Sequence, residues 1–297
     1  MISGFGMCAG YLDKFQSGVI DLDAFYRKRY QKILPFFGTL LFISLLIEHN
    51  RSTVYEISIE VLLLHGLLPN NAVSVIGVCW TLGVIFLFYL LFPAFSVLMK
   101  SKKRAWVSLA ISLWVVFVCD KYFFSDYFVA ESFSPRHNFL YCLPLFIAGS
   151  LVYLYRSEIM RGCEQIGIVS LLICIAVSGL WYLKPTGMKM ISYIGSLLMF
   201  SMWLSYAVGS NSKFLSSKPM RFLSGISMEM YLAQMVIFRV VEKLHLLYLF
   251  GDTGIGGWMS FIFAFALTVL GLIAFIECYK IIVKLWEQWK GAKCGKA

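Results

Sequence analysis

The chain has 297 residues, of which 60% are hydrophobic and 14% are charged, and its formal net charge is +10. A soluble domain averages about 45–50% apolar and about 25% charged residues, so this composition excludes an ordinary soluble domain. The hydrophobic excess must face lipid. The positive charge does not indicate nucleic-acid binding, because the cations lie in short loops between apolar runs, as in membrane proteins.

Eight apolar runs predict transmembrane helices. In chain order these are Leu34–Ile47, Val73–Leu98, Ala105–Cys119, Phe139–Tyr155, Ile166–Leu183, Met190–Val208, Phe222–Val241 and Trp258–Val283. A ninth run, Met1–Leu12, spans only about 18 Å as a helix, against about 30 Å of hydrocarbon. We interpret it as the tail of a span whose beginning is missing. The expected fold class is therefore all-α, a polytopic membrane helical bundle of about eight full transmembrane helices plus a partial N-terminal one.

The cations predict the orientation of this bundle. Alternating loops place 19 of the 26 Lys and Arg residues on one side, including the loops around Arg27, Lys102, Arg156 and Lys218. The remaining seven are Arg51, Lys121, Arg136, Lys184, Lys189, Arg239 and Lys243. Cytoplasmic loops carry the excess of Lys and Arg, so the first side and the C-terminus are expected in the cytoplasm.

The densest basic cluster is FYRKRYQKILP, Phe25–Pro35, which holds Arg27, Lys28, Arg29 and Lys32. Arg pairs bidentately with phosphate, and Lys supplies a point charge. If the segment is helical, Arg27 and Arg29 point to different faces, so that one face can bind an anion while another meets lipid headgroups. The alternative interpretation is a plain topology anchor.

Two later segments carry further candidate residues. CWTLGVIFLFYLLFP, Cys79–Pro93, predicts a helix dense in aromatic residues, which are also common as ordinary packing residues in membrane helices. LSGISMEMYLAQ places Ser227, Glu229 and Tyr231 in or beside a span. A carboxylate at membrane depth suggests a functional site. The alternative is a Glu at the interface that pairs with Arg221 or Lys218, just as Glu277 can pair with Lys280.

The eight cysteines form no CxxC pair and no metal-like spacing with histidine, so we interpret them as packing residues and expect no metal site. No nucleophile elbow, P-loop or zinc motif is present in the sequence. Any group transfer is therefore expected to pass directly from donor to acceptor, without a metal.

In the order and spacing of its segments, the chain resembles the integral-membrane acyltransferase family 3, whose members O-acylate carbohydrates. The motifs that carry the resemblance are ISGF at Ile2–Phe5, the basic cluster, WTLGVIFLFYLLFP, GISMEMYL at Gly225–Leu232, and the region of Glu277. The resemblance implies an acyl-CoA donor, with acetyl-CoA as the first candidate, and a carbohydrate acceptor on a surface polysaccharide or its lipid-linked precursor. It also implies a bacterial inner (cytoplasmic) membrane location, the lipid bilayer as partner, and no bound cofactor.

The resemblance also assigns roles to residues. Arg27, Lys28 and Arg29 match the basic motif that contacts the donor, and Trp80 with Thr81 matches a tryptophan-serine-leucine motif. The expected substrate cavity is formed by Tyr26, Trp80, Thr81, Tyr89, Ser227, Glu229 and Tyr231.

The chain departs from the family pattern at three ionisable positions. The family's first span, with an arginine and the histidine that resembles a general base, is expected to be missing from the single domain 1–297. Ile85 stands where the family has glutamate, and Gln234 where it often has histidine. Of the remaining histidines, His49, His65, His137 and His245, we take His65 as the weak candidate for a base, since it precedes the Trp80 span.

These departures leave two alternatives to a working O-acyltransferase. One is a truncated or inactive relative that keeps the fold without catalysis. The other is a transporter or polymerase of polysaccharide or lipid-linked sugar. Polymerases usually have a long external loop and transporters repeated halves with broken helices, and the sequence shows neither.

Overall fold

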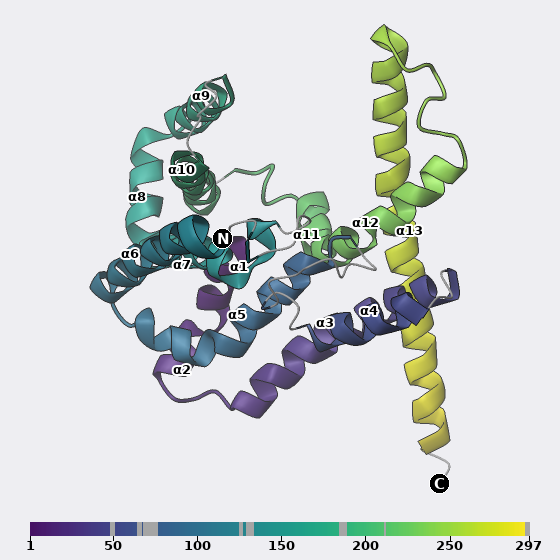
Figure 1. Cartoon of the computed structure of the whole chain (residues 1–297), viewed down its shortest axis with the longest axis horizontal. Helices are drawn as coiled ribbons and strands as arrows, with labels where there is room; N and C mark the ends of the chain where they lie inside the picture. The colour runs from purple at the N-terminus through teal and green to yellow at the C-terminus, as the bar shows by residue number, and fades with distance from the viewer. Residues whose placement is uncertain are drawn as a thin grey trace.

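The computed structural model describes residues 1–47, 51–63, 67, 77–124, 127–128, 134–183, 189–210 and 212–294. Every regular element within these ranges is a helix, which confirms the all-α prediction (Figure 1). The elements are α1 (Ile2–Met7), η1 (Cys8–Leu12), α2 (Asp13–Gln16), α3 (Leu22–Ile47), α4 (Arg51–Leu62), α5 (Cys79–Leu98), α6 (Lys102–Val118), η3 (Cys119–Phe123), η4 (Pro135–His137), α7 (Phe139–Leu154), α8 (Arg156–Ile166), α9 (Val169–Leu183), α10 (Lys189–Gly209), α11 (Lys218–Gly225), α12 (Ser227–Lys243) and α13 (Gly254–Cys294).

Four helical stretches are long and apolar enough to cross a membrane: Cys79–Leu98, Lys102–Phe123, Met190–Gly209 and Gly254–Trp286. The bent pair of α7 and α8 makes a fifth if it is counted as one span. These match five of the eight predicted runs. The number of about eight spans is not confirmed.

The other three predicted runs differ from full spans for visible reasons. α9 has only 15 residues. α3 is 26 residues long, but it begins with the basic cluster, so only its second half is apolar. The run from Phe222 to Val241 is broken at Ile226, which separates the short α11 from α12. A continuous helix over that run was therefore a wrong prediction.

Local sequence explains how several helices begin and turn. Ser101 caps α6, since its hydroxyl accepts a hydrogen bond from the Arg104 amide. Asn138 caps α7 in the same way through the Leu140 amide, at 2.9 Å. α7 and α8 meet at an angle of 72°, at the point where the apolar sequence of α7 gives way to the polar sequence of α8.

The N-terminal run Met1–Leu12 is helical, as expected, and packs on α7. Its backbone approaches α7 very closely: a Cβ atom on Gly4 would lie 2.1 Å from the Phe146 carbonyl oxygen. A Cβ on Gly149 of α7 would lie 2.0 Å from the Met1 carbonyl oxygen. Small residues that let helix backbones touch are typical of packing in membranes.

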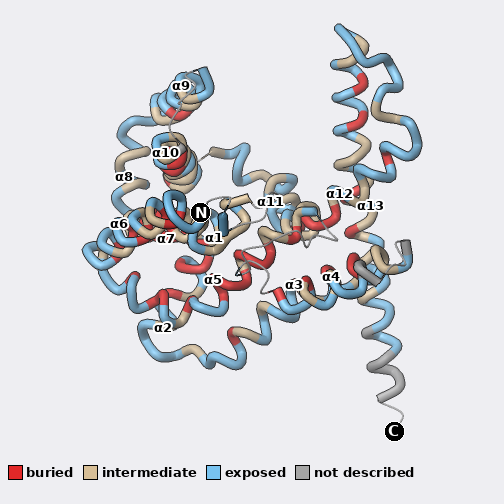
Figure 2. Tube along the Cα trace, viewed as in Figure 1, coloured by how far each residue is buried: buried red, intermediate tan, exposed pale blue. Residues whose placement is uncertain are grey.

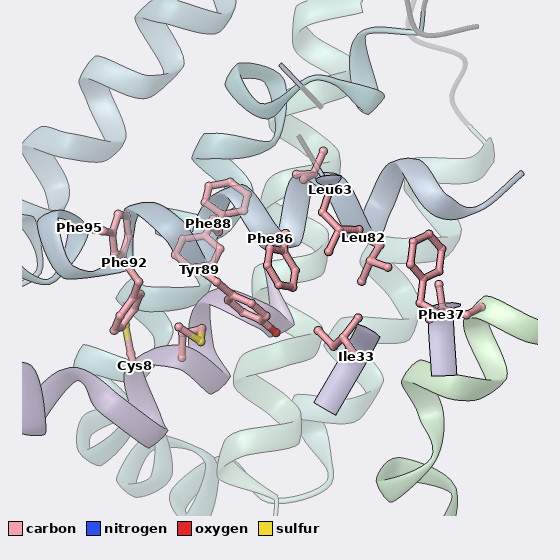
Figure 3. Packing of buried hydrophobic residues seen from close by; sticks show 14 of the residues in the cluster. Cys8, Ile33, Phe37, Leu63, Leu82, Phe86, Phe88, Tyr89, Phe92 and Phe95 are labelled. Carbon is pink, nitrogen blue, oxygen red and sulfur yellow. The ribbon is translucent and has the colours of Figure 1, made fainter. Parts of the chain in front are cut away.

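The core is centred on α5. Figure 3 shows the rings of Phe86, Tyr89 and Phe92 along α5, with Cys8 of η1 beside one part of the helix and Ile33 of α3 beside another. More than half of the apolar window of α5, 56%, is buried, compared with 22% for α13. Buried residues accordingly gather along α5 and α7 in Figure 2, whereas α9 and much of α13 are exposed.

Candidate active site

Arg29 lies in an aromatic cradle built from three helical segments. Its guanidinium carbon is 4.5 Å from the ring centroid of Tyr11, 4.9 Å from that of Tyr89 and 5.7 Å from that of Phe25. The Nε atom is buried and has no hydrogen-bond partner. The rings stabilise the cation through their faces, while the planar edge of the guanidinium keeps donors for an anion.

The rest of the basic cluster points elsewhere, as the helical spacing predicts. Arg27 is exposed and forms a surface ion pair with Asp23 at 3.4 Å. Lys28 is also exposed. Such surface ion pairs contribute little to the stability of the protein. The cluster is therefore divided: Arg29 faces the core, and Arg27 with Lys28 faces out.

Tyr26 fixes the start of α3 against α5. Its hydroxyl donates a hydrogen bond to the Leu90 carbonyl oxygen at 2.8 Å. Burial, and then the neighbouring Tyr30, raise the pKa of Tyr26, so the hydroxyl keeps its proton and remains a donor. Tyr26 thus positions the cradle and is not itself part of it.

Thr81 and Tyr231 meet although they are 150 residues apart. Their hydroxyls form a hydrogen bond of 2.7 Å in a partly buried position, which joins α5 to α12. Thr81 is eight residues from Tyr89, which corresponds to about 12 Å along the helix. The Arg29 cradle and the Thr81–Tyr231 pair thus lie at two levels of the same helix.

Trp80, next to Thr81, stacks on His137. The ring centroids are 4.5 Å apart, and the planes differ by 19°. His137 ends η4, the short turn that leads into the Asn138 cap of α7. The sequence reasoning did not select His137. A usable signal was present: α5 and α7 both begin on the same predicted side of the membrane, so residues at their starts lie at one level.

Glu229 does not form the ion pair with Arg221 or Lys218 that was one of its two interpretations. Its Oε2 atom is buried and lacks a hydrogen-bond partner. The break at Ile226 puts both cations on a separate helix, α11. The functional interpretation of Glu229 stays a prediction. Glu277, by contrast, pairs with Lys280 at 2.8 Å as predicted.

One other candidate is not brought to this region. Ser227 is exposed, and its hydroxyl donates to the Ser224 carbonyl oxygen at 2.9 Å. His65 lies outside the described residues. The predicted cavity residues that the core holds in place therefore include Trp80, Thr81, Tyr89 and Tyr231.

The chain matches the family profile described as "Acyltransferase domain" over residues 1–277. The chain belongs to acyltransferase family 3. None of the curated proteins and none of the solved structures is similar enough to match. The membrane helices and the family together make this chain an integral-membrane member of acyltransferase family 3.

Proposed function

We propose that this acyltransferase-3 chain is an O-acyltransferase. It transfers an acyl group, acetyl as the first candidate, from acyl-CoA to a sugar hydroxyl of a surface polysaccharide or its lipid-linked precursor. It works in the bacterial cytoplasmic membrane as one domain, with its C-terminus in the cytoplasm.

The observation that carries the proposal is the Arg29 cradle. A guanidinium with aromatic rings on its faces and a buried, unpartnered Nε is suited to a phosphate-bearing ligand, because phosphate oxygens accept from its planar edge. Coenzyme A carries such phosphates at one end and the reactive thioester at the other. The exposed Arg27 and Lys28 add positive charge along the approach to the cradle.

The reaction needs a second group of residues at a distance from this phosphate site. Thr81, Tyr231 and the Trp80–His137 stack lie about 12–14 Å along α5 from Tyr89. An extended donor held by Arg29 can direct its thioester toward that level. Glu229, on the first turn of α12, stays a candidate for the same cavity.

At that level the sugar hydroxyl attacks the thioester carbonyl carbon. The new C–O bond forms, the C–S bond breaks, and the hydroxyl proton passes to a base and then to the departing thiolate. A positioned base contributes about 10²–10⁴-fold to such a step. Among the described histidines His137 is the one placed against the Trp80 motif, so we assign it this role, with His65 as the alternative.

The direct test uses membranes that contain the overproduced chain. Acetyl-CoA with a labelled acetyl group is added together with a panel of bacterial polysaccharides, and the glycan fraction is measured for label. The proposal predicts label in an ester that mild alkali removes, and only background in membranes without the chain. Absence of donor-dependent label, with transport of a lipid-linked sugar in its place, would favour the transporter alternative.

A further inference from the structure

A polar cavity of about 790 Å³ lies at the ends of α6, α7 and α10. Its wall includes Asp120 of η3, Arg136 of η4, Tyr141 of α7, and Tyr193 and Ser196 of α10. These helix ends are opposite to the ends that carry the basic loops, so the cavity is on the predicted outer side. Its volume is within the range of about 300–1,000 Å³ that is usual for small-molecule sites.

One wall of the cavity is aromatic and fixed. The Tyr193 hydroxyl donates to the Tyr141 carbonyl oxygen at 2.7 Å, and the two rings are 4.7 Å apart in an edge-to-face arrangement. Tyr193 is buried and packs with Leu197 and Val116. A rigid aromatic surface of this kind suits the apolar C–H face of a sugar ring, which a flexible polar surface would not bind.

The lining of the cavity also includes one residue of each charge, Asp120 and Arg136. Neither Asp120 nor Arg136 takes part in an ion pair among the described residues, although both interact electrostatically with Tyr141. Ser196 donates its proton to the Ser192 carbonyl oxygen at 2.9 Å, so its oxygen can accept from a ligand. A carboxylate accepts hydrogen bonds, a guanidinium donates them, and a polyhydroxylated ligand needs both.

The combination of aromatic, charged and hydroxyl side chains distinguishes this cavity from two others in the protein. Those have volumes of about 470 and 370 Å³ and are lined mainly by apolar side chains, as expected where lipid chains pack. A phospholipid headgroup can pair its phosphate with Arg136, but it has no ring face for the aromatic surface of Tyr141 and Tyr193. A carbohydrate has hydroxyls for Asp120 and ring oxygens for Arg136.

The cavity is joined to the candidate active site through one short turn. Arg136, in the cavity wall, is followed by His137, which stacks on Trp80. A ligand in the cavity therefore lies across η4 from the level at which Thr81 and Tyr231 meet.

We infer that this cavity binds the carbohydrate acceptor, with Asp120 and Ser196 accepting hydrogen bonds from sugar hydroxyls and Tyr141 and Tyr193 forming the apolar wall. The inference rests on the proposed function for the identity of the ligand as acceptor. Sugar binding itself is measurable without any transfer.

Binding is tested by saturation-transfer NMR on the purified full chain in an amine-oxide detergent, since glucoside and maltoside detergents would compete. The probes are the methyl glycosides of galactose, glucose, mannose and rhamnose. At least one is expected to bind, with about tenfold weaker affinity in D120N, the effect of losing one hydrogen bond to a charged group. S196A should weaken binding in the same direction. K121A is the matched control, because Lys121 is exposed next to Asp120 and is not in the wall.

Binding of no probe, or equal binding by D120N and K121A, overturns the inference. Glycerol 1-phosphate that displaces the sugar and binds D120N more tightly would identify a headgroup site instead. Transfer kinetics separate the two proposals. If transfer occurs but D120N leaves the KM for acceptor unchanged, this cavity is excluded while the proposed function stands. Sugar binding without transfer would leave the cavity assignment intact and reject the function.

Discussion

Arg29 and Arg27 are two positions apart, yet their surroundings differ completely. Tyr11, Phe25 and Tyr89 surround the Arg29 guanidinium, whereas Arg27 lies on the surface with Asp23. Two residues turn a helix by about 200°, which is why neighbouring cations can have separate roles. Two arginines of one cluster can therefore have different roles, because they lie on different faces of the helix.

His137 is the residue whose role depends most on its contact. We predict that H137N lowers kcat for acyl transfer by about 10²–10⁴-fold, the usual contribution of a positioned base. The KM for acetyl-CoA should stay near the wild-type value, because the proposed phosphate site at Arg29 lies at the other level of α5. Steady-state kinetics in membranes, normalised to the amount of chain, measure both constants.

H245N is the control for this prediction, because His245 lies in the connection between α12 and α13 and is exposed. It should keep the wild-type kcat. A fully active H137N together with an inactive H65N would transfer the role to His65.

At the scale of the elements, the contact between α1 and α7 depends on two glycines, Gly4 and Gly149. The main chains of the two helices are so close that a methyl group on Gly4 would overlap the Phe146 carbonyl. Two positions further along α1, a methyl group on Gly6 would have no atom within 4 Å. The helix α1 thus has one glycine at the interface and one away from it.

We predict opposite effects of alanine at the two glycines of α1. G4A forces the helices apart and should destabilise the protein by about 1–3 kcal/mol, as overpacking does. G6A should leave stability unchanged or raise it by up to about 1 kcal/mol, because alanine favours a helix over glycine. Thermal unfolding in detergent compares the two; equal melting temperatures would show that α1 does not pack on α7 in this way.

The elements also show what periodicity and hydropathy can predict. The apolar runs located α6 and α10 to within a few residues, since lipid-facing helices need long unbroken hydrophobic sequences. They located α5 and α13 less closely, because α5 begins at Cys79 and α13 continues to Cys294. The break at Ile226 was not foreseen, because a single glycine such as Gly225 is also tolerated inside helices. The 72° bend between α7 and α8 was expected only as the end of a span, and not as the start of a polar helix.

At the scale of the whole molecule, the predicted orientation of the bundle is open to a direct test. The starts of α3 and α6 carry Arg and Lys, and the polar cavity lies at the opposite end of α6, beside the starts of α7 and α10. We predict that the new thiol of K103C reacts with a membrane-impermeant maleimide only after the cells are permeabilised. The thiol of K121C should react in intact cells.

Both variants are made in a chain with its native cysteines replaced, because Cys278 is exposed. The reverse labelling pattern would invert the predicted orientation.

The candidate site was less predictable than the bundle. The order of the motifs predicted Arg29, Trp80, Thr81 and Tyr231 as site residues. All four have side-chain contacts within the core region. The partners of these residues come from distant segments, such as Tyr11 and His137, and no local pattern connects them. Only the packed helices reveal those contacts.

The central claim is that the Arg29 cradle binds the acyl donor, and the KM for acetyl-CoA tests it most directly. R29A should raise this KM by about 10–100-fold, the effect of losing hydrogen bonds from a charged group. R29K, which keeps the charge but loses the planar edge, should lie between R29A and wild type. R27A should raise the KM far less than R29A, because Arg27 adds only charge along the approach and its surface ion pair with Asp23 contributes little. Equal KM values for R29A and R27A would contradict the account.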